Sequence, residues 1–234
     1  MPYWKFDEPA TKLFHREFIG VPNANWGIEF VTGNPLEFWV TDTLPGIIRI
    51  PFFNTDTQPA FVRSELQTMT LGGDDNLYAD FVREMEGDPH GEAHGNFGGF
   101  LQIIHFAAKD PLFFLLHANV DRLWAKWQWL HRRFDTAKPA TYPFLGSAGE
   151  SNSERIGHNL LNDTMWPWNQ VTGTGAPNDR PVTAPGGALA ASPTTNAPGS
   201  MPRVGDMIDY QGVIKQGNRL GFAYDDVEFL PPGP

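Results

Sequence analysis

Two Asp-Pro dipeptides in this chain, at 88–89 and 110–111, each stand directly before a segment that carries histidine. Aspartate is a favoured N-cap and proline a favoured first residue of a helix, so both dipeptides predict helix starts. The first segment holds His90 and His94, whose spacing places them on one face of a helix. The second holds His117 within a strongly apolar run. Because that run must be buried, we expect the two helices to pack together and bring three imidazoles to one place.

Three converging neutral imidazoles form a nitrogen-only donor set. Such a set suits copper or zinc better than calcium or magnesium. The apolar surroundings of His117 would shield the site from bulk water, which favours redox or oxygen chemistry over an adventitious surface ion. The competing interpretation is structural, with His90 and His94 as solvated helix residues and His117 as a hydrogen-bonded core histidine.

The composition limits the classes of protein to which the chain can belong. Its 234 residues suffice for one domain, and a hydrophobic content of 41% with 18 Phe and 8 Trp supplies a core. A net charge of −10 argues against nucleic acid or an anionic membrane as a partner. The absence of cysteine excludes disulfides, thiolate catalysis and sulfur-ligated metals. The sequence shows no signal peptide or membrane-spanning stretch, so we expect a soluble chain of unassigned compartment.

The spacing of apolar residues predicts where helices and strands form. Residues 1–60 are rich in Pro, Gly, Asn and aromatic residues without a helical period, and Ile47–Phe53 is the best strand candidate among them. Apolar residues at helical spacing predict a helix over Asp74–Glu86, ended by Gly87. A second helix is predicted from the Asp110 cap to about His131.

These elements predict a mainly α fold, a helical bundle with long irregular loops and a few short strands. We expect a single domain over residues 1–234, within which 172–205 form an irregular loop rich in Pro, Gly, Ala and Ser. The last thirty residues are expected to form a short helix and strands. The predicted buried face of the long helix comprises Phe113, Leu116, Val120, Leu123, Trp124 and Trp127.

Four motifs resemble the tyrosinase and catechol oxidase (polyphenol oxidase) family, the type-3 copper proteins. Residues 110–124, DPLFFLLHANVDRLW, resemble the copper-B signature of Asp-Pro, aromatic residues, a His-His pair and Asn-x-Asp-Arg. Residues 90–99, HGEAHGNFGG, resemble the first two copper-B ligands and their Gly-Gly exit. Residues 2–7, PYWKFD, resemble the segment between the copper-A and copper-B regions, and 220–225, LGFAYD, resemble the tyrosine motif that closes the catalytic core.

The resemblance implies that His90, His94 and His117 are the copper-B ligands. Leu116 stands where the family often has the first histidine of the pair, so the ligand maps onto His117. A type-3 centre uses two coppers and six histidines, and the family's copper-A triad precedes the segment that begins here at residue 2. The chain therefore resembles the second half of the core, as a truncated product, a fragmentary gene model or one subunit of a split enzyme. The other histidines do not reproduce a copper-A triad: His15, His105, His131 and His158.

The resemblance also implies a catalytic carboxylate. Glu86 precedes His90 by four residues, the spacing of a family glutamate that holds a water near the copper. Such a carboxylate could accept a phenolic proton. The alternatives are an ordinary last-turn glutamate, or Glu84 or Glu92 in the same role.

Three more residues are candidates for the substrate pocket or for orienting ligands. Gly91 stands where relatives with strong monophenol hydroxylase activity often have Asn, which favours diphenol oxidation here. Ile104 falls where the family places bulky residues over the pocket, and His105 is expected to be structural or at the rim. Asp121, one turn after His117, either orients an imidazole or pairs with a basic neighbour.

The functional prediction is a copper-dependent oxidoreductase that oxidises o-diphenols to o-quinones with dioxygen, with hydroxylation of monophenols left open. The chain would hold one copper, which becomes dinuclear with a copper-A half on a partner chain or a missing N-terminal segment. Its expected partners are a phenolic small molecule and dioxygen, and neither nucleic acid nor membrane. The alternatives are a mononuclear copper or zinc protein, although HGEAH is not the zincin motif HExxH, and a non-catalytic fragment that aggregates or needs a partner.

Overall fold

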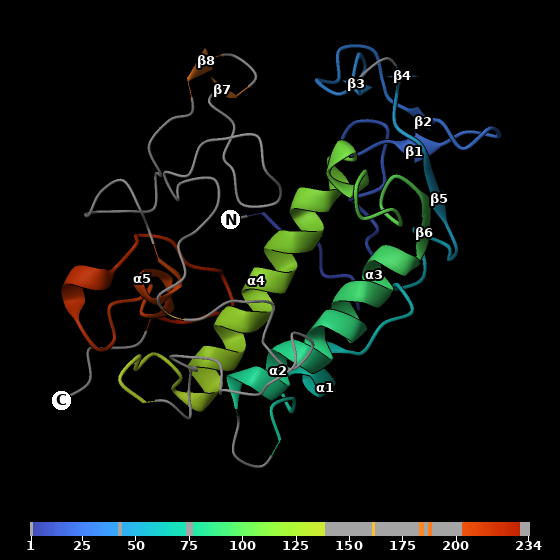
Figure 1. Ribbon diagram of the computed structural model, residues 1–234. Coiled ribbons are helices and arrows are strands. Elements are labelled where there is room, and N and C mark those ends of the chain that lie inside the picture. The colour runs from blue at the N-terminus through green and yellow to red at the C-terminus, as the bar shows by residue number, and fades with distance from the viewer. Residues whose placement is uncertain are drawn as a thin grey trace. The chain divides into compact units, whose positions relative to one another are not determined.

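The computed structural model describes residues 2–41, 44–73, 77–138 and 203–229, together with residues 161, 183–184 and 187–188 (Figure 1). The chain divides into two units: Met1–Leu71 with Arg83–Trp127, and Gly72–Val82 with Gln128–Pro234. Helices make up only about a third of the described residues, so the expectation of a mainly α fold is not confirmed. Loops and short two-stranded ribbons form most of the remainder.

The α-helices are α1 (Glu65–Thr68), α2 (Tyr78–Met85), α3 (Glu92–Gly95), α4 (Leu112–His131) and α5 (Val204–Ile208). A π-helical turn, Glu86–Gly91, joins α2 to α3, and 3-10 turns cover Ala107–Lys109 and Gln216–Asn218. The strands pair as four antiparallel ribbons: β1 (Val21–Pro22) with β2 (Ile28–Glu29), β3 (Val40–Thr41) with β4 (Leu44–Pro45), β5 (Arg49–Pro51) with β6 (Phe97–Gly99), and β7 (Thr183–Ala184) with β8 (Gly187–Ala188).

Helix α4 begins and ends close to where the sequence predicts. The carboxylate of Asp110 accepts a hydrogen bond from the backbone amide of Leu112 at 2.9 Å, which confirms it as the N-cap. The predicted apolar face is confirmed in part. Leu116, Leu123 and Trp127 are buried, whereas the other predicted members are only half-buried: Phe113, Val120 and Trp124.

The segment that leads to the first histidines follows the prediction where the structure describes it. Asp74 lies outside the described residues, and the helical path that includes α2 ends at Gly87, since the π-helical turn spans a kink at the next residue. The backbone leaves helical geometry at Asp88 alone within that turn (φ −142°, ψ 118°), so the predicted restart at Pro89 is right. The Asp88 carboxylate accepts the backbone amide of Arg63 at 2.6 Å and so ties this restart to the segment before α1.

The β5–β6 ribbon fixes the chain that follows α3. The strand predicted over Ile47–Phe53 is β5, shortened to three residues, and it pairs with β6 in the register Arg49 to Gly99. Gly99 has φ +87°, and a Cβ there would lie 2.3 Å from the carbonyl oxygen of Ile48. Only glycine permits this close approach of the two backbones. The ribbon packs beside an aromatic cluster in which Phe97 lies edge-on to Trp4.

Less of the second unit can be compared with the prediction. Within residues 203–229 the structure has the expected short helix, α5, but no strand. The predicted 172–205 loop lies mostly outside the described residues; β7, β8 and residues 203–205 are its described parts. None of the described helices combines the length and apolar character that crossing a bilayer requires.

Candidate metal centre

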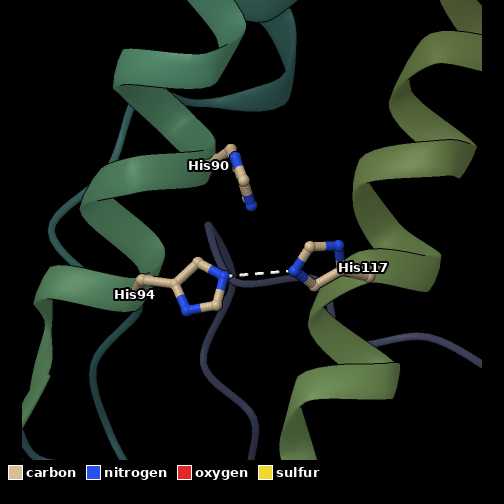
Figure 2. A group of neighbouring side chains, drawn as sticks. All are labelled: His90, His94 and His117. Carbon is tan, nitrogen blue, oxygen red and sulfur yellow. Dashed lines mark hydrogen bonds between the residues drawn. The ribbon is translucent and has the colours of Figure 1, made fainter. Parts of the chain in front are cut away.

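The three predicted histidines meet in the first unit, where the helical stretch ending in α3 lies beside α4. Figure 2 shows the rings of His90 and His94 pointing from one helix toward His117 on the other. One nitrogen from each ring lies within 4.8 Å of the others, and among the described residues this is the one group of such side chains able to hold a metal ion. The Nε2 atoms of His94 and His117 are 3.2 Å apart. The structure therefore brings together the triad that the sequence predicts.

The second ring nitrogen of His94 decides which atom faces the site. Nδ1 of His94 lies 2.8 Å from the carbonyl oxygen of Leu101. A carbonyl can only accept a hydrogen bond, so Nδ1 carries the proton and Nε2 keeps its lone pair. His94 is thus held in the tautomer that binds metal through Nε2.

His90 is oriented in the same way by a carboxylate. Its Nδ1 lies 3.2 Å from Oε2 of Glu86, four residues earlier in the π-helical turn. This leaves Nε2 of His90, which is buried and has no hydrogen-bond partner. Leaving a buried polar atom unpaired costs free energy. A bound metal ion would satisfy this nitrogen.

His117 is held in its neutral form by its surroundings. Burial, followed by the neighbouring His90 and His94, lowers the pKa of His117 from 6.5 to about 4, although Glu86 opposes the shift. Burial also lowers the pKa of His94, although its bond to the Leu101 carbonyl opposes the shift. The ring of His117 stacks on Phe113, with centroids 4.0 Å apart and planes at 29°. Both imidazoles are therefore in the neutral form at neutral pH, in which one ring nitrogen has a lone pair available to a metal ion.

The donor set fits copper or zinc. Imidazole nitrogens lie about 2.0–2.1 Å from such an ion, so two ligands of a tetrahedral ion are about 3.3 Å apart. The 3.2 Å between Nε2 of His94 and Nε2 of His117 matches that spacing. Three neutral nitrogens also leave a fourth position open, as catalytic sites do. With equal access to both metals, a nitrogen site of this kind favours copper.

A cavity of about 600 Å³ opens over the triad. Glu86 and Gly91 line it, as does Ile104, whose side chain is 90% exposed at its edge. His105 is exposed and does not line the cavity. Asp121 is half-buried on α4 and is also not part of the lining. The other lining residues are Gly95, Leu101, Gln102, Ala107 and Phe113.

Two contributors to the site are not identified by sequence reasoning. Phe113 is predicted only as part of the buried face of α4, although its position four residues before His117 is a usable signal for ring contact. Leu101 acts through its backbone carbonyl, so its side chain carries no signal at all. Asp121 keeps its predicted role only as a hypothesis.

Comparison with known proteins shows the family to which the chain belongs. The common central domain of tyrosinase matches residues 1–130. A tyrosinase of Neurospora crassa is 45% identical over 71 residues, which are 29% of this chain and 10% of that protein. A tyrosinase of Podospora anserina is 42% identical over 71 residues, 29% of this chain and 12% of that protein. Hemocyanin 2 of Megathura crenulata is 31% identical over 114 residues, 42% of this chain and 3% of that protein.

These relatives include both tyrosinases and hemocyanins, which are not enzymes. The matched segments span about an eighth or less of those three proteins. The domain match nevertheless covers more than half of this chain and includes the whole histidine triad. The chain belongs to the tyrosinase family of type-3 copper proteins, and its triad of His90, His94 and His117 is consistent with a type-3 copper site.

Proposed function

We propose that the chain forms the copper-B part of a phenol oxidase that converts o-diphenols to o-quinones with dioxygen. The observation that carries this proposal is the cavity of about 600 Å³ above the triad. Its volume lies in the range of small-molecule sites, and Phe113 and Ile104 give it the apolar walls that a planar aromatic ring needs. Space for an aromatic ring beside the triad supports turnover of a phenolic substrate.

In this proposal the three imidazoles hold one copper, which supplies electron transfer to dioxygen when bound. Burial around His94 and His117 limits the access of bulk water to the ligands. Glu86 lies on the cavity wall, and its hydrogen bond with His90 is the largest cause of its lowered pKa. It is therefore ionised at neutral pH. One carboxylate oxygen can hold His90 while the other accepts the phenolic proton.

Type-3 chemistry uses two coppers, so the proposal includes a second triad outside the one seen here. Among the described residues no second cluster of potential ligands accompanies the first. His15 is exposed and bonds the carbonyl of Thr11, and His105 is exposed as well. We therefore place the second copper on another segment or another polypeptide.

Two other functions remain as candidates. Similarity to Hemocyanin 2 favours a dioxygen carrier without phenol turnover. The three-nitrogen geometry with an open position also fits a mononuclear copper or zinc protein.

The test starts with the purified full chain, freed of metal and then titrated with copper. Copper content, dioxygen-dependent absorbance and catechol-dependent dioxygen uptake are measured with and without a copper-A segment taken from a family member. Catechol oxidation by the mixture supports the oxidase. Reversible dioxygen binding without turnover indicates a carrier, and one copper with no dioxygen response indicates a mononuclear protein. His94→Ala and His117→Ala should abolish copper binding, whereas the exposed His105→Ala should not.

A further inference from the structure

The segment between His94 and its hydrogen-bond partner Leu101 runs along strand β5. The carbonyl of Asn96 accepts the amide of Phe52 at 2.9 Å, the β5–β6 register pairs Arg49 with Gly99, and the amide of Phe100 donates to the carbonyl of Ile48 at 3.3 Å. The ribbon therefore holds the chain from just after one ligand to just before the carbonyl that orients it. The position of the His94 ring depends on β5.

The side chain of Arg49 leaves this ribbon and binds the start of α4. Its Nε donates to Oδ2 of Asp110 at 2.8 Å, and its Nη2 donates to Oδ1 at 2.5 Å. Arg49 is 1% exposed, and Asp110 is fully buried. A third donor, Nη1, reaches the carbonyl of Ile19 at 3.0 Å. The guanidinium thus makes a two-pronged, charge-assisted contact that a different side chain could not reproduce.

Asp110 is also the N-cap of α4, the helix that carries His117. One buried contact therefore joins the ribbon that positions His94 to the helix that positions His117. Among the described residues no backbone hydrogen bond joins the His94 segment to α4 across the site, so side-chain contacts between them help to set the 3.2 Å between the two Nε2 atoms. The Arg49–Asp110 pair is a rigid and fully buried contact of this kind.

We propose that Arg49 is a positioning residue of the metal centre, which sets the distance between the His94 and His117 ligands through Asp110 and β5. This inference rests on the proposed metal-binding role of the triad. Outer residues that orient metal ligands change metal affinity by 10–100-fold when they are replaced. A purely structural ion pair would change stability without changing the metal site.

Arg122 provides a matched control. It is also fully buried on α4, and it bonds Oδ1 of Asn119 at 2.9 Å and the carboxylate of Glu65. Glu65 begins α1, which carries no member of the triad. The Glu65 side chain is 19% exposed, and replacing Arg122 removes its ion pair while leaving the contact between Arg49 and Asp110, which joins β5 to α4, intact.

The experiment uses the full chain with Co²⁺ as a spectroscopic probe, comparing Arg49→Lys, Asp110→Asn and Arg122→Lys. Arg49→Lys keeps the positive charge but loses the two-pronged guanidinium contact with the carboxylate. Asp110→Asn keeps a side chain that can cap α4 but loses the ion pair. We expect Arg49→Lys and Asp110→Asn to weaken Co²⁺ binding by about tenfold and to shift its visible bands. Arg122→Lys should lower the unfolding temperature while leaving Co²⁺ affinity and bands as in the unmodified chain.

Wild-type affinity and bands in folded Arg49→Lys or Asp110→Asn would overturn the inference, as would an equal loss in Arg122→Lys. If Arg49→Lys does not fold, Asp110→Asn alone decides. An unmodified chain that binds neither Co²⁺ nor copper would instead refute the metal-binding role itself. His117→Ala removes one of the three proposed ligands and provides the reference for the Co²⁺ bands of a chain that does not bind the metal.

Discussion

Glu86 contacts Nδ1 of His90 at 3.2 Å, and this contact leaves Nε2 as the metal-facing nitrogen of that histidine. The family resemblance alone suggests a different role, in which the glutamate holds a water. The geometry adds the orientation of a ligand to that role. Because both residues lie in one π-helical turn, this orientation depends on the local backbone between Glu86 and Gly91.

Replacing Glu86 should weaken the metal site. Glu86→Gln keeps the shape of the side chain but removes the charge that favours a proton on Nδ1 of His90, so we expect copper affinity to fall roughly tenfold. Glu92→Gln is the control, since Glu92 is exposed and does not line the cavity. Competition titration with a copper chelator measures both. Equal affinities in the two variants would show that Glu86 does not act on His90.

Gly91 is constrained by sterics as well as by chemistry. A Cβ at this position would lie 2.9 Å from the carbonyl oxygen of Glu86, which is backbone and cannot move cheaply. We expect Gly91→Ala to destabilise the fold by about 1–3 kcal/mol and to weaken copper binding as the turn shifts. The same constraint means that Asn at this position would first distort the site.

Gly95→Ala is the matched control for Gly91→Ala. Its Cβ would meet only Oε2 of Glu92, at 3.9 Å, which is an ordinary contact. Alanine favours a helix over glycine by up to about 1 kcal/mol, so stability should be unchanged or higher. Urea unfolding and copper titration of the two variants check this. A Gly91→Ala chain as stable as Gly95→Ala would contradict the steric argument.

The metal-free chain should lose stability in acid. An unfolded imidazole has a pKa near 6.5, whereas that of folded His117 is lowered to about 4. Between these values the unfolded chain binds more protons, so the free energy of unfolding falls as pH drops through this window. After screening by solvent, His117 should account for roughly 2 kcal/mol. The lowered pKa of Glu86 acts in the same direction below its ordinary value of 4.5.

Urea unfolding of the metal-free chain at pH 7.5 and pH 4.5 measures this loss. His117→Gln removes the titrating ring and should show a smaller loss between the two pH values. Equal losses in the two proteins would mean that His117 is not the source of the acid sensitivity.

A substitution at the rim of the cavity should change KM for the substrate without changing the free energy of unfolding. Ile104 lines the cavity with 90% of its side chain exposed, so Ile104→Ala should change the free energy of unfolding by less than about 0.5 kcal/mol. On the proposed function it should raise KM for catechol a few-fold at constant copper content. The adjacent Ile103, 46% exposed and not part of the lining, provides the control. A rise in KM for Ile103→Ala of the same size would place the substrate elsewhere.

The sequence by itself determined the features that depend on short-range chemistry. The Asp110 cap and Pro111 begin α4 as predicted, because N-capping involves atoms only two or three residues apart. The spacing of His90 and His94 predicts two histidines on one helical face, the motif around His117 predicts the third, and the structure brings the three together in a group that could hold a metal ion. Residues 1–60 form turns, irregular segments and short strands, as the absence of a helical period predicts, whereas the mainly α expectation is not confirmed because helices make up only about a third of the described residues.

The tertiary structure alone decided how those ligands are held. The Leu101 carbonyl that fixes His94 belongs to the backbone, which every residue possesses, so no residue type marks it. Arg49 and Asp110 are separated by 61 residues, and nothing local to either predicts that they meet. Helix capping and helical periodicity depend on residues that are close together in the sequence. The distance between two ligands on different segments exists only after burial and pairing have brought those segments together.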